Sequence, residues 1–334
     1  MWRYWELLPL TSPKAAIDLG EVMTPIIELP CLAAELGVSR LTVKDEGVLP
    51  TGSFKARGAA IGVARLRELG GSAFVMPTNG NAGAAWAFYA ARARIAAHVV
   101  IPADAPLITR AEAILAGATV TVVPGSISDA GRCAGELAAE NGWFDASTFK
   151  EPYRLEGKKT IGFEIAEQRS WRLPDAVVYP TGGGVGLVGM WKAWTELREL
   201  GLLDRLPQLI AAQSAGCAPV VRAFEAGMDR CDVWPDAMTH AFGLNVPHPL
   251  AGALILKALR ESNGCAVAVD EDAIVSERLH TARAEGLHLC PEGACAVAAA
   301  RMLAGSGRFG GSADILVLNT GSGLKYPPEA ADQA

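Results

Sequence analysis

The chain has 334 residues, of which 50% are hydrophobic and 20% charged, and its net charge is −6 at pH 7. This composition excludes a disordered or low-complexity protein, because so many apolar side chains can offset the entropy cost of ordering the chain. The acidic balance predicts no general attraction to nucleic acid or to an anionic membrane. No apolar run suggests a transmembrane helix, and no apolar segment typical of a signal peptide follows the first residues.

Short apolar runs alternate with longer helical patterns along the whole chain. Strands are expected at residues 41–44, 73–76, 97–101, 120–123, 176–179, 209–212, 266–269 and 315–318. Helices are expected between them, including 59–69, 82–94, 187–200 and 272–285. Several strand runs are apolar at every position, as in strands covered on both faces. The alternation predicts an α/β fold with open, mostly parallel twisted sheets wrapped by helices.

Four glycine-containing turns follow predicted strands. They are residues 50–55, 78–81, 181–186 and 319–323. In parallel sheets, ligands bind outside the carboxyl ends of the strands. The four turns are therefore expected to contribute to one shared cleft.

Lys55 stands at the start of a predicted helix, with Ser53 as its expected cap. The positive end of a helix dipole disfavours an ammonium group there, which suits a lysine that forms a Schiff base. On this evidence alone, an ordinary surface lysine is the alternative.

In the second turn, Asn79 and Asn81 flank Gly80. An asparagine could cap the following helix, or one amide could reach a cofactor oxygen while exposed N–H groups bind a substrate carboxylate.

The third turn, residues 181–186 (Thr-Gly-Gly-Gly-Val-Gly), lies between a predicted strand and a predicted helix. Backbone N–H groups that curl around an anion, together with the helix dipole, would hold a phosphate here. The alternative is a tight turn without a ligand. The spacing differs from the G-x-G-x-x-G dinucleotide motif, and no Lys-Ser or Lys-Thr pair follows as in a P-loop.

In the last turn, the hydroxyl of Thr320 could bond an aromatic nitrogen or cap the turn.

Seven cysteines and five histidines are scattered, with no C-x-x-C and no H-E-x-x-H pattern. The odd number of cysteines favours reduced thiols in the cytoplasm over a disulfide framework. Cys290 and Cys295 are the closest pair, but no second pair or histidine cluster accompanies them, so no metal site is expected.

In order along the chain, these segments resemble the pyridoxal-phosphate enzymes of the tryptophan-synthase-β type, known as fold type II. The resemblance is strongest to threonine synthase and its threonine-synthase-like relatives. The motifs that carry it are Lys44-Asp45-Glu46, residues 50–58 (PTGSFKARG), Gly80-Asn81-Ala82-Gly83, residues 152–160 (PYRLEGKKT), 180–184 (PTGGG), Pro291-Glu292-Gly293-Ala294 and 319–325 (NTGSGLK). They extend over nearly the whole chain.

The resemblance implies a large cofactor-binding domain of residues 1–55 and 147–334 and a small domain of residues 56–146, with pyridoxal 5′-phosphate between them. It makes Lys55 the catalytic lysine that holds the cofactor. Asn81 would bond the phenolic oxygen, Thr320 would face the pyridine nitrogen, and Phe54 and the turn at Glu292 would line the cleft. The implied phosphate-binding residues are Gly182, Gly183, Gly184, Val185 and Gly186.

The implied reaction converts O-phospho-L-homoserine and water into L-threonine and phosphate, by γ-elimination followed by addition of water at Cβ. The implied substrate-binding residues are Thr78, Asn79, Gly80, Lys150 and Arg154. Arg154 and Lys150 would bind the departing phosphate, although Arg154 could instead form a structural pair with Glu151 or Glu156.

The resemblance also implies a homodimer that acts on a small amino acid, without nucleic-acid or membrane partners. Many relatives carry Ser or Thr in place of Asn79, and Asn in place of Glu151. The runner-up function is a threonine or serine ammonia-lyase, and a non-catalytic protein that binds a phosphate ligand is a third possibility.

Overall fold

The computed structural model describes residues 1–103 and 105–326. The chain divides into two compact units. Unit 1 contains residues 1–23 and 49–161, and unit 2 contains residues 24–48 and the chain from Gly162 onward. The boundaries between these two units differ from the domain boundaries expected from the sequence. Residues 1–23, 49–55 and 147–161 group with the segment 56–146. Met1, Leu8, Leu10, Ile17 and Leu49 share a hydrophobic core with that segment, and Tyr153 packs against it.

Unit 2 is built on a six-stranded sheet with the order β1-β2-β10-β7-β8-β9. The strands are β1 (Ile26–Glu28), β2 (Arg40–Asp45), β7 (Ala176–Pro180), β8 (Gln208–Ser214), β9 (Cys265–Val269) and β10 (Asp314–Asn319). All neighbours pair in parallel except β1, which runs antiparallel to β2 at the edge. Every residue of β7 is buried, as its unbroken apolar sequence predicts.

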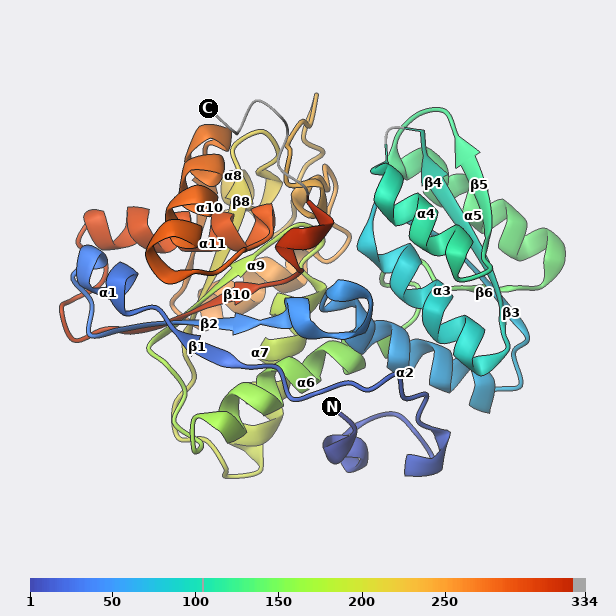
Figure 1. Cartoon of the computed structure of the whole chain (residues 1–334), viewed down its shortest axis with the longest axis horizontal. Helices are drawn as coiled ribbons and strands as arrows, with labels where there is room; N and C mark the ends of the chain where they lie inside the picture. Colours follow the sequence, from blue (N-terminus) through green and yellow to red (C-terminus); the bar gives the residue numbers. More distant parts are fainter. Residues whose placement is uncertain (104, 327–334) are drawn as a thin grey trace. The chain divides into compact units, whose positions relative to one another are not determined.

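Helices cover this sheet on both faces. They are α1 (Pro30–Leu36), α7 (Val185–Glu199), α8 (Pro219–Glu225), α9 (Gly252–Glu261), α10 (Glu271–Glu285) and α11 (Pro291–Gly305), with short 3₁₀ turns at η3 (Glu46–Val48), η5 (Phe242–Leu244) and η6 (Gly323–Lys325). In Figure 1, α10 and α11 lie on one face of the sheet and α7 on the other. The first ten residues of α11 are buried, because its small side chains let it pack closely on the sheet.

Unit 1 is built on a four-stranded parallel sheet with the order β5-β4-β3-β6. Its strands are β3 (Ala73–Pro77), β4 (Ala96–Pro102), β5 (Thr119–Val123) and β6 (Phe144–Asp145), and its helices are α2 (Lys55–Glu68), α3 (Asn81–Ala93), α4 (Leu107–Leu115) and α5 (Ile127–Asn141). Short 3₁₀ turns are η1 (Trp2–Leu7), η2 (Pro13–Ala15) and η4 (Pro50–Gly52). Phe74 and Met76 pack with α2 and α3, whereas Val75 packs with α5. This alternation is the period of two expected for a strand covered on both faces.

One further helix, α6 (Tyr153–Gln168), contributes its first nine residues to unit 1 and the rest to unit 2. The predicted α/β class is confirmed, and all eight expected strands and four expected helices form. Within the described ranges, no helix is long and apolar enough to cross a membrane.

Candidate active site

Lys55 is the first residue of α2, as the sequence predicts. Its Nζ lies 4.3 Å from the centre of the Phe54 ring, and the Nζ of Lys158 lies 4.2 Å from the same centre. Lys158 also donates a hydrogen bond to the Phe54 carbonyl and is only 3% exposed. The side chains of two lysines therefore contact one aromatic ring. The sequence motifs assign no role to Lys158, although its spacing of four from Arg154 on one helix face could have indicated a shared surface.

Ser53 does not cap α2 through its side chain, contrary to expectation. Phe54 already has helical backbone angles and is the N-cap residue, so Ser53 lies one position too early. The Ser53 hydroxyl is buried and has no hydrogen-bond partner among the residues that the structure describes. A buried hydroxyl without a partner costs free energy, so this atom, two residues before Lys55, is suited to bond a ligand.

Close packing between α2 and α6 fixes the start of α2. The carbonyl of Arg57 lies so near Gly157 that a Cβ at residue 157 would overlap it. Gly58 faces Arg154 in the same way, at 3.1 Å from the Arg154 carbonyl for an added Cβ. Glycine at both positions lets the two helix backbones approach. Arg57, which is fully buried, donates to the Thr160 hydroxyl at 2.9 Å and adds a polar tie between the helices.

The turn at residues 78–81 follows β3 and begins α3. The Thr78 hydroxyl accepts hydrogen bonds from the N–H groups of Gly80 at 3.1 Å and Gly83 at 3.3 Å. Asn81 is the first residue of α3, and Gly80 is its N-cap. The alternative in which Asn81 caps this helix is therefore not supported. The predicted substrate residues Thr78, Asn79 and Gly80 form one continuous turn with the predicted cofactor residue Asn81.

The glycine loop at residues 182–186 follows β7 and begins α7 in unit 2. A Cβ at residue 182 would overlap the Gly243 carbonyl, and one at residue 186 would overlap the Tyr179 hydroxyl. Gly184 has a left-handed backbone with φ of +72°, and no side chain caps the helix. In contrast, nothing lies within 4 Å of a Cβ built at Gly183. The loop thus combines crowded glycines, an open middle position and a helix N-terminus, which is the arrangement that a phosphate requires.

Thr320 follows β10 in unit 2 and is 7% exposed. Its hydroxyl oxygen lies 3.9 Å from the Sγ of Cys290. The Cys290 thiol donates to the Asn319 amide oxygen at 3.2 Å, and the Asn319 amide nitrogen donates to Asp45 at 2.8 Å. Burial, followed by the charge of Glu292, raises the pKa of Cys290 well above its usual value, so this thiol stays neutral. Thr320 therefore has a neutral hydrogen-bonding neighbour.

Arg154 is 6% exposed and is held by its own unit. Its Nε donates to Glu151 at 2.8 Å and one terminal nitrogen donates to Thr148 at 2.8 Å. The other terminal nitrogen donates to the Ala146 carbonyl, and the guanidinium lies 5.2 Å from the Trp86 ring centre. These contacts support the alternative in which Arg154 forms a structural pair with Glu151.

Lys150, the second predicted phosphate ligand, is more accessible. Its side chain is 51% exposed and pairs with Asp145 at 2.8 Å. The two predicted phosphate ligands thus lie in the same segment of unit 1, one buried and one at the surface.

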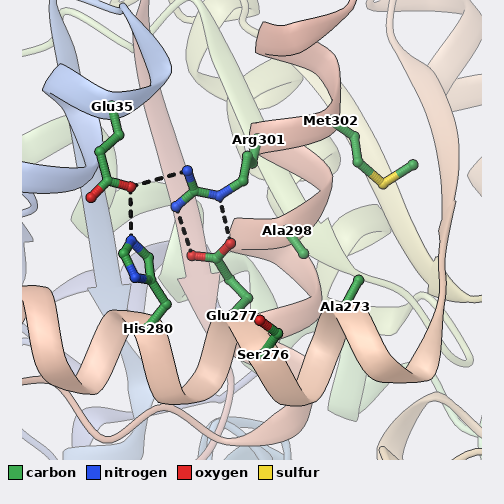
Figure 2. A pocket seen from close by; sticks show the side chains of 8 residues that line it. All are labelled: Glu35, Ala273, Ser276, Glu277, His280, Ala298, Arg301 and Met302. Atoms are coloured by element: carbon green, nitrogen blue, oxygen red, sulfur yellow. Dashed lines mark hydrogen bonds and ion pairs between the residues drawn. The ribbon is translucent and has the colours of Figure 1, made fainter.

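A cavity of about 370 Å³ lies elsewhere in unit 2, between α1, α10 and α11. It is lined by Glu35, Ala273, Ser276, Glu277, His280, Ala298, Arg301 and Met302. Figure 2 shows that Arg301 bridges the two carboxylates, with Nε 2.7 Å from Glu277 and a terminal nitrogen 3.1 Å from Glu35. His280 lies 2.8 Å from Glu35. These contacts pair the charged groups with one another, so we interpret the cavity as a structural ion-pair network.

Comparison with known proteins assigns the chain to a family. A family model described as pyridoxal-phosphate dependent enzyme matches residues 17–321. Threonine synthase from Methanosarcina acetivorans is 34% identical over 333 residues, covering 99% of this chain and 82% of that protein. Threonine synthase from Methanocaldococcus jannaschii is also 34% identical, over 331 residues with the same coverage.

Solved structures share the fold. Maize serine racemase superposes with a TM-score of 0.82 at 24% identity, covering 96% of this chain and 93% of that one. A threonine deaminase from T.th. superposes with a TM-score of 0.77 at 26% identity, covering 92% of this chain and 94% of that one.

The residues of this chain fit the cofactor that the family implies. The open position at Gly183, the uncapped start of α7 and the unpartnered Ser53 hydroxyl provide places for a phosphate and for further hydrogen bonds. The predicted residues are distributed over both units, with Phe54, Lys55 and Asn81 in unit 1 and residues 182–186 and Thr320 in unit 2. The chain belongs to the family of pyridoxal-phosphate-dependent enzymes of fold type II, and within it to the threonine synthases.

Proposed function

We propose that this protein is a pyridoxal-phosphate-dependent threonine synthase, which converts O-phospho-L-homoserine and water into L-threonine and phosphate. The observation that carries the proposal is the 34% identity to two curated threonine synthases over 99% of this chain. The similarity covers every motif that the sequence analysis singles out. It is therefore not restricted to the cofactor-binding segments that unrelated reactions of this fold share.

In this proposal the chain's own residues bind, orient and transfer protons. Pyridoxal phosphate, when bound, supplies an electron sink for negative charge at the substrate Cα. Lys55 would hold the cofactor, and its amine would serve as the base and acid that moves protons between Cα, Cβ and Cγ of the substrate. The turn at residues 78–81, in which the Gly80 N–H already donates to the Thr78 hydroxyl, would bind the substrate carboxylate, and the glycine loop would bind the cofactor phosphate. Thr320 would offer a neutral hydroxyl to the pyridine nitrogen, which would suit elimination and replacement better than transamination.

The departing phosphate requires cations, and the two predicted ones, Arg154 and Lys150, differ in how far their side chains are already bonded within the protein. Arg154 is already bonded to Glu151, Thr148 and the Ala146 carbonyl, so a phosphate would have to compete for its remaining N–H groups. Lys150 is half exposed and is held by one carboxylate. We therefore propose that Lys150 is the cation that binds the departing phosphate. Arg154 instead stabilises the segment of chain that carries Lys150.

A threonine or serine ammonia-lyase is the second candidate, because Arg154 is engaged inside the protein. Such an enzyme eliminates water from the hydroxy amino acid, and hydrolysis of the resulting imine releases ammonia and a 2-oxo acid, so it has no need of a site for a leaving phosphate. The likeness to the T.th. threonine deaminase is consistent with a fold that accommodates this reaction.

One comparison of products separates the two candidates. Purified enzyme is incubated with O-phospho-L-homoserine or with L-threonine, and phosphate and ammonia are measured, with Lys55→Ala as the inactive control. Threonine synthase releases phosphate from O-phospho-L-homoserine and forms L-threonine in equal amount. Ammonia from L-threonine, without phosphate release from the first substrate, would overturn the proposal in favour of the lyase.

We further propose a cytoplasmic homodimer. All seven cysteines are free thiols, and among them Cys31 is exposed. Free thiols in this number suit a reducing compartment. The dimer follows from the family resemblance, and sedimentation velocity of the full chain tests it, with a monomer as the contradicting result.

A further inference from the structure

Glu292 is a buried carboxylate whose two oxygens have different surroundings. It is 4% exposed and lies in the first turn of α11, where the helix dipole stabilises a negative charge. Oε1 accepts hydrogen bonds from the Gly243 N–H and from the Tyr326 hydroxyl, both at 2.8 Å. Oε2 is also buried, and no hydrogen bond to it is found in the described part of the chain; the Cys290 thiol lies near this carboxylate but donates to Asn319 at 3.2 Å. A buried carboxylate oxygen without a donor is costly, because the charge has lost its water without compensation.

Glu292 is linked through neighbouring residues to both segments of unit 2 that are predicted to hold the cofactor. On one side, Glu292 holds Gly243, whose carbonyl leaves no room for a side chain at Gly182 in the glycine loop. On the other side, Cys290 caps the same helix two residues earlier and lies 3.9 Å from the Thr320 hydroxyl. The turn Phe242–Leu244 is thereby tied to the glycine loop and to α11 at the same time.

A purely structural carboxylate in the same unit looks different. Glu277 is 5% exposed, yet both of its oxygens are paired with Arg301, at 2.7 and 3.1 Å. The packing of unit 2 can therefore satisfy both oxygens of a buried carboxylate. Asp314 of the same unit also has an oxygen without a partner, but its side chain is 26% exposed, whereas Glu292 is 4% exposed. At Glu292 it satisfies Oε1 and leaves Oε2 buried without a donor. The contrast points to a ligand as the missing donor.

We propose that Glu292 is a ligand-binding residue: its Oε2 accepts a hydrogen bond from an N–H or O–H group of the bound cofactor or amino acid, while its Oε1 positions the turn 242–244 against the glycine loop. The proposal rests on the cofactor site described above, but it does not require that the substrate is O-phospho-L-homoserine. A carboxylate aimed at the bound ligand differs from the neutral hydroxyl of Thr320, because it favours a donor that carries positive charge.

The test uses Glu292→Gln in the full-length enzyme. Glutamine keeps the shape of the side chain and an oxygen for Gly243 and Tyr326, but its amide puts a donor where Oε2 was an acceptor. Apoenzyme is titrated with pyridoxal phosphate, and the holoenzyme is then titrated with L-threonine, following the cofactor absorbance in both cases. Thermal unfolding of the apoenzyme is measured in parallel. Glu277→Gln is the matched control, because it also removes a buried charge but breaks a pair with Arg301.

We expect Glu292→Gln to weaken one of the two binding steps at least about tenfold, while the control lowers thermal stability and leaves both dissociation constants within about twofold. Weaker binding of pyridoxal phosphate identifies the cofactor as the donor, and an effect on L-threonine alone identifies the amino acid. If both constants and the absorbance spectrum stay at the wild-type values, the proposal is overturned. If the glutamine variant does not fold, Glu292→Asp is measured in the same way, and unchanged binding there overturns it equally. Failure of the proposed function would instead be seen in the wild type, as absence of phosphate release.

Discussion

Replacing Arg154 by alanine distinguishes a structural role of this residue from a role in binding the departing phosphate. The substitution removes side-chain hydrogen bonds to Glu151, Thr148 and the Ala146 carbonyl, and the contact with Trp86. It also leaves the carboxylate of Glu151, which is 4% exposed, without its cation. Loss of one partner from a buried ion pair costs about 3–5 kcal/mol. For a chain of this size we expect the melting temperature to fall by on the order of 10 °C.

The pH dependence of this loss follows from Glu151. Burial raises the pKa of Glu151 above its ordinary value of 4.5, and the charge and hydrogen bonds of Arg154 oppose the rise. Without Arg154 the pKa rises further, so the folded state binds a proton that the unfolded state releases above about pH 4.5. The stability of Arg154→Ala must therefore decline as the pH rises above about 4.5, more steeply than that of the wild type.

The assay is thermal unfolding of Arg154→Ala, Glu151→Gln and the double variant across this pH range. The double variant removes the stranded charge, so it should recover at least about 2 kcal/mol of what the single variant loses and flatten the pH profile. Phosphate release from O-phospho-L-homoserine by the folded double variant then shows whether Arg154 also assists the reaction. An Arg154→Ala protein with wild-type stability at about pH 8 would refute the structural reasoning.

Three further substitutions test the predicted site and its supports. Lys55→Ala should fold but lose turnover by several orders of magnitude, and near-normal phosphate release would contradict the assignment. Gly183→Asp should keep its melting temperature, since nothing lies within 4 Å of an added Cβ, while pyridoxal-phosphate affinity falls at least about tenfold; an unchanged titration would place the phosphate elsewhere. Gly157→Ala should destabilise the folded protein by about 1–3 kcal/mol, because the added Cβ would overlap the Arg57 carbonyl. A variant that unfolds like the wild type would show that α2 and α6 can move apart to accommodate the Cβ.

Sequence reasoning predicts the elements whose signal is local. The unbroken apolar run of β7 and the turn that follows it indicate a buried strand and a phosphate loop. The strands β1 and β6, which the sequence does not predict, have three and two residues, too few for any periodicity to be recognised. The prediction of Ser53 as a cap is wrong because the start of a helix depends on the backbone angles of Phe54, which composition does not reveal.

The features that the sequence hides depend on contacts between distant residues. Nothing in the local sequence around Glu292 shows that Gly243 and Tyr326 both donate to one of its oxygens, since these residues lie 49 and 34 positions away. The engagement of Arg154 is open at the sequence level for a related reason. Glu151 is recognisable as a partner, but the bonds to Thr148 and Ala146 depend on how the segment folds back.

The distribution of the thiols gives the protein a natural attachment point for a spectroscopic probe. Cys31, near the start of α1, is exposed, whereas burial raises the pKa of Cys217 and of Cys231 to about 11 and keeps those thiols protonated at neutral pH. A maleimide dye at neutral pH should therefore react first at Cys31. Because Cys31 lies on α1, outside every segment assigned to cofactor or substrate, a fluorophore there would report the unfolding of unit 2 in the native sequence, without engineered cysteines.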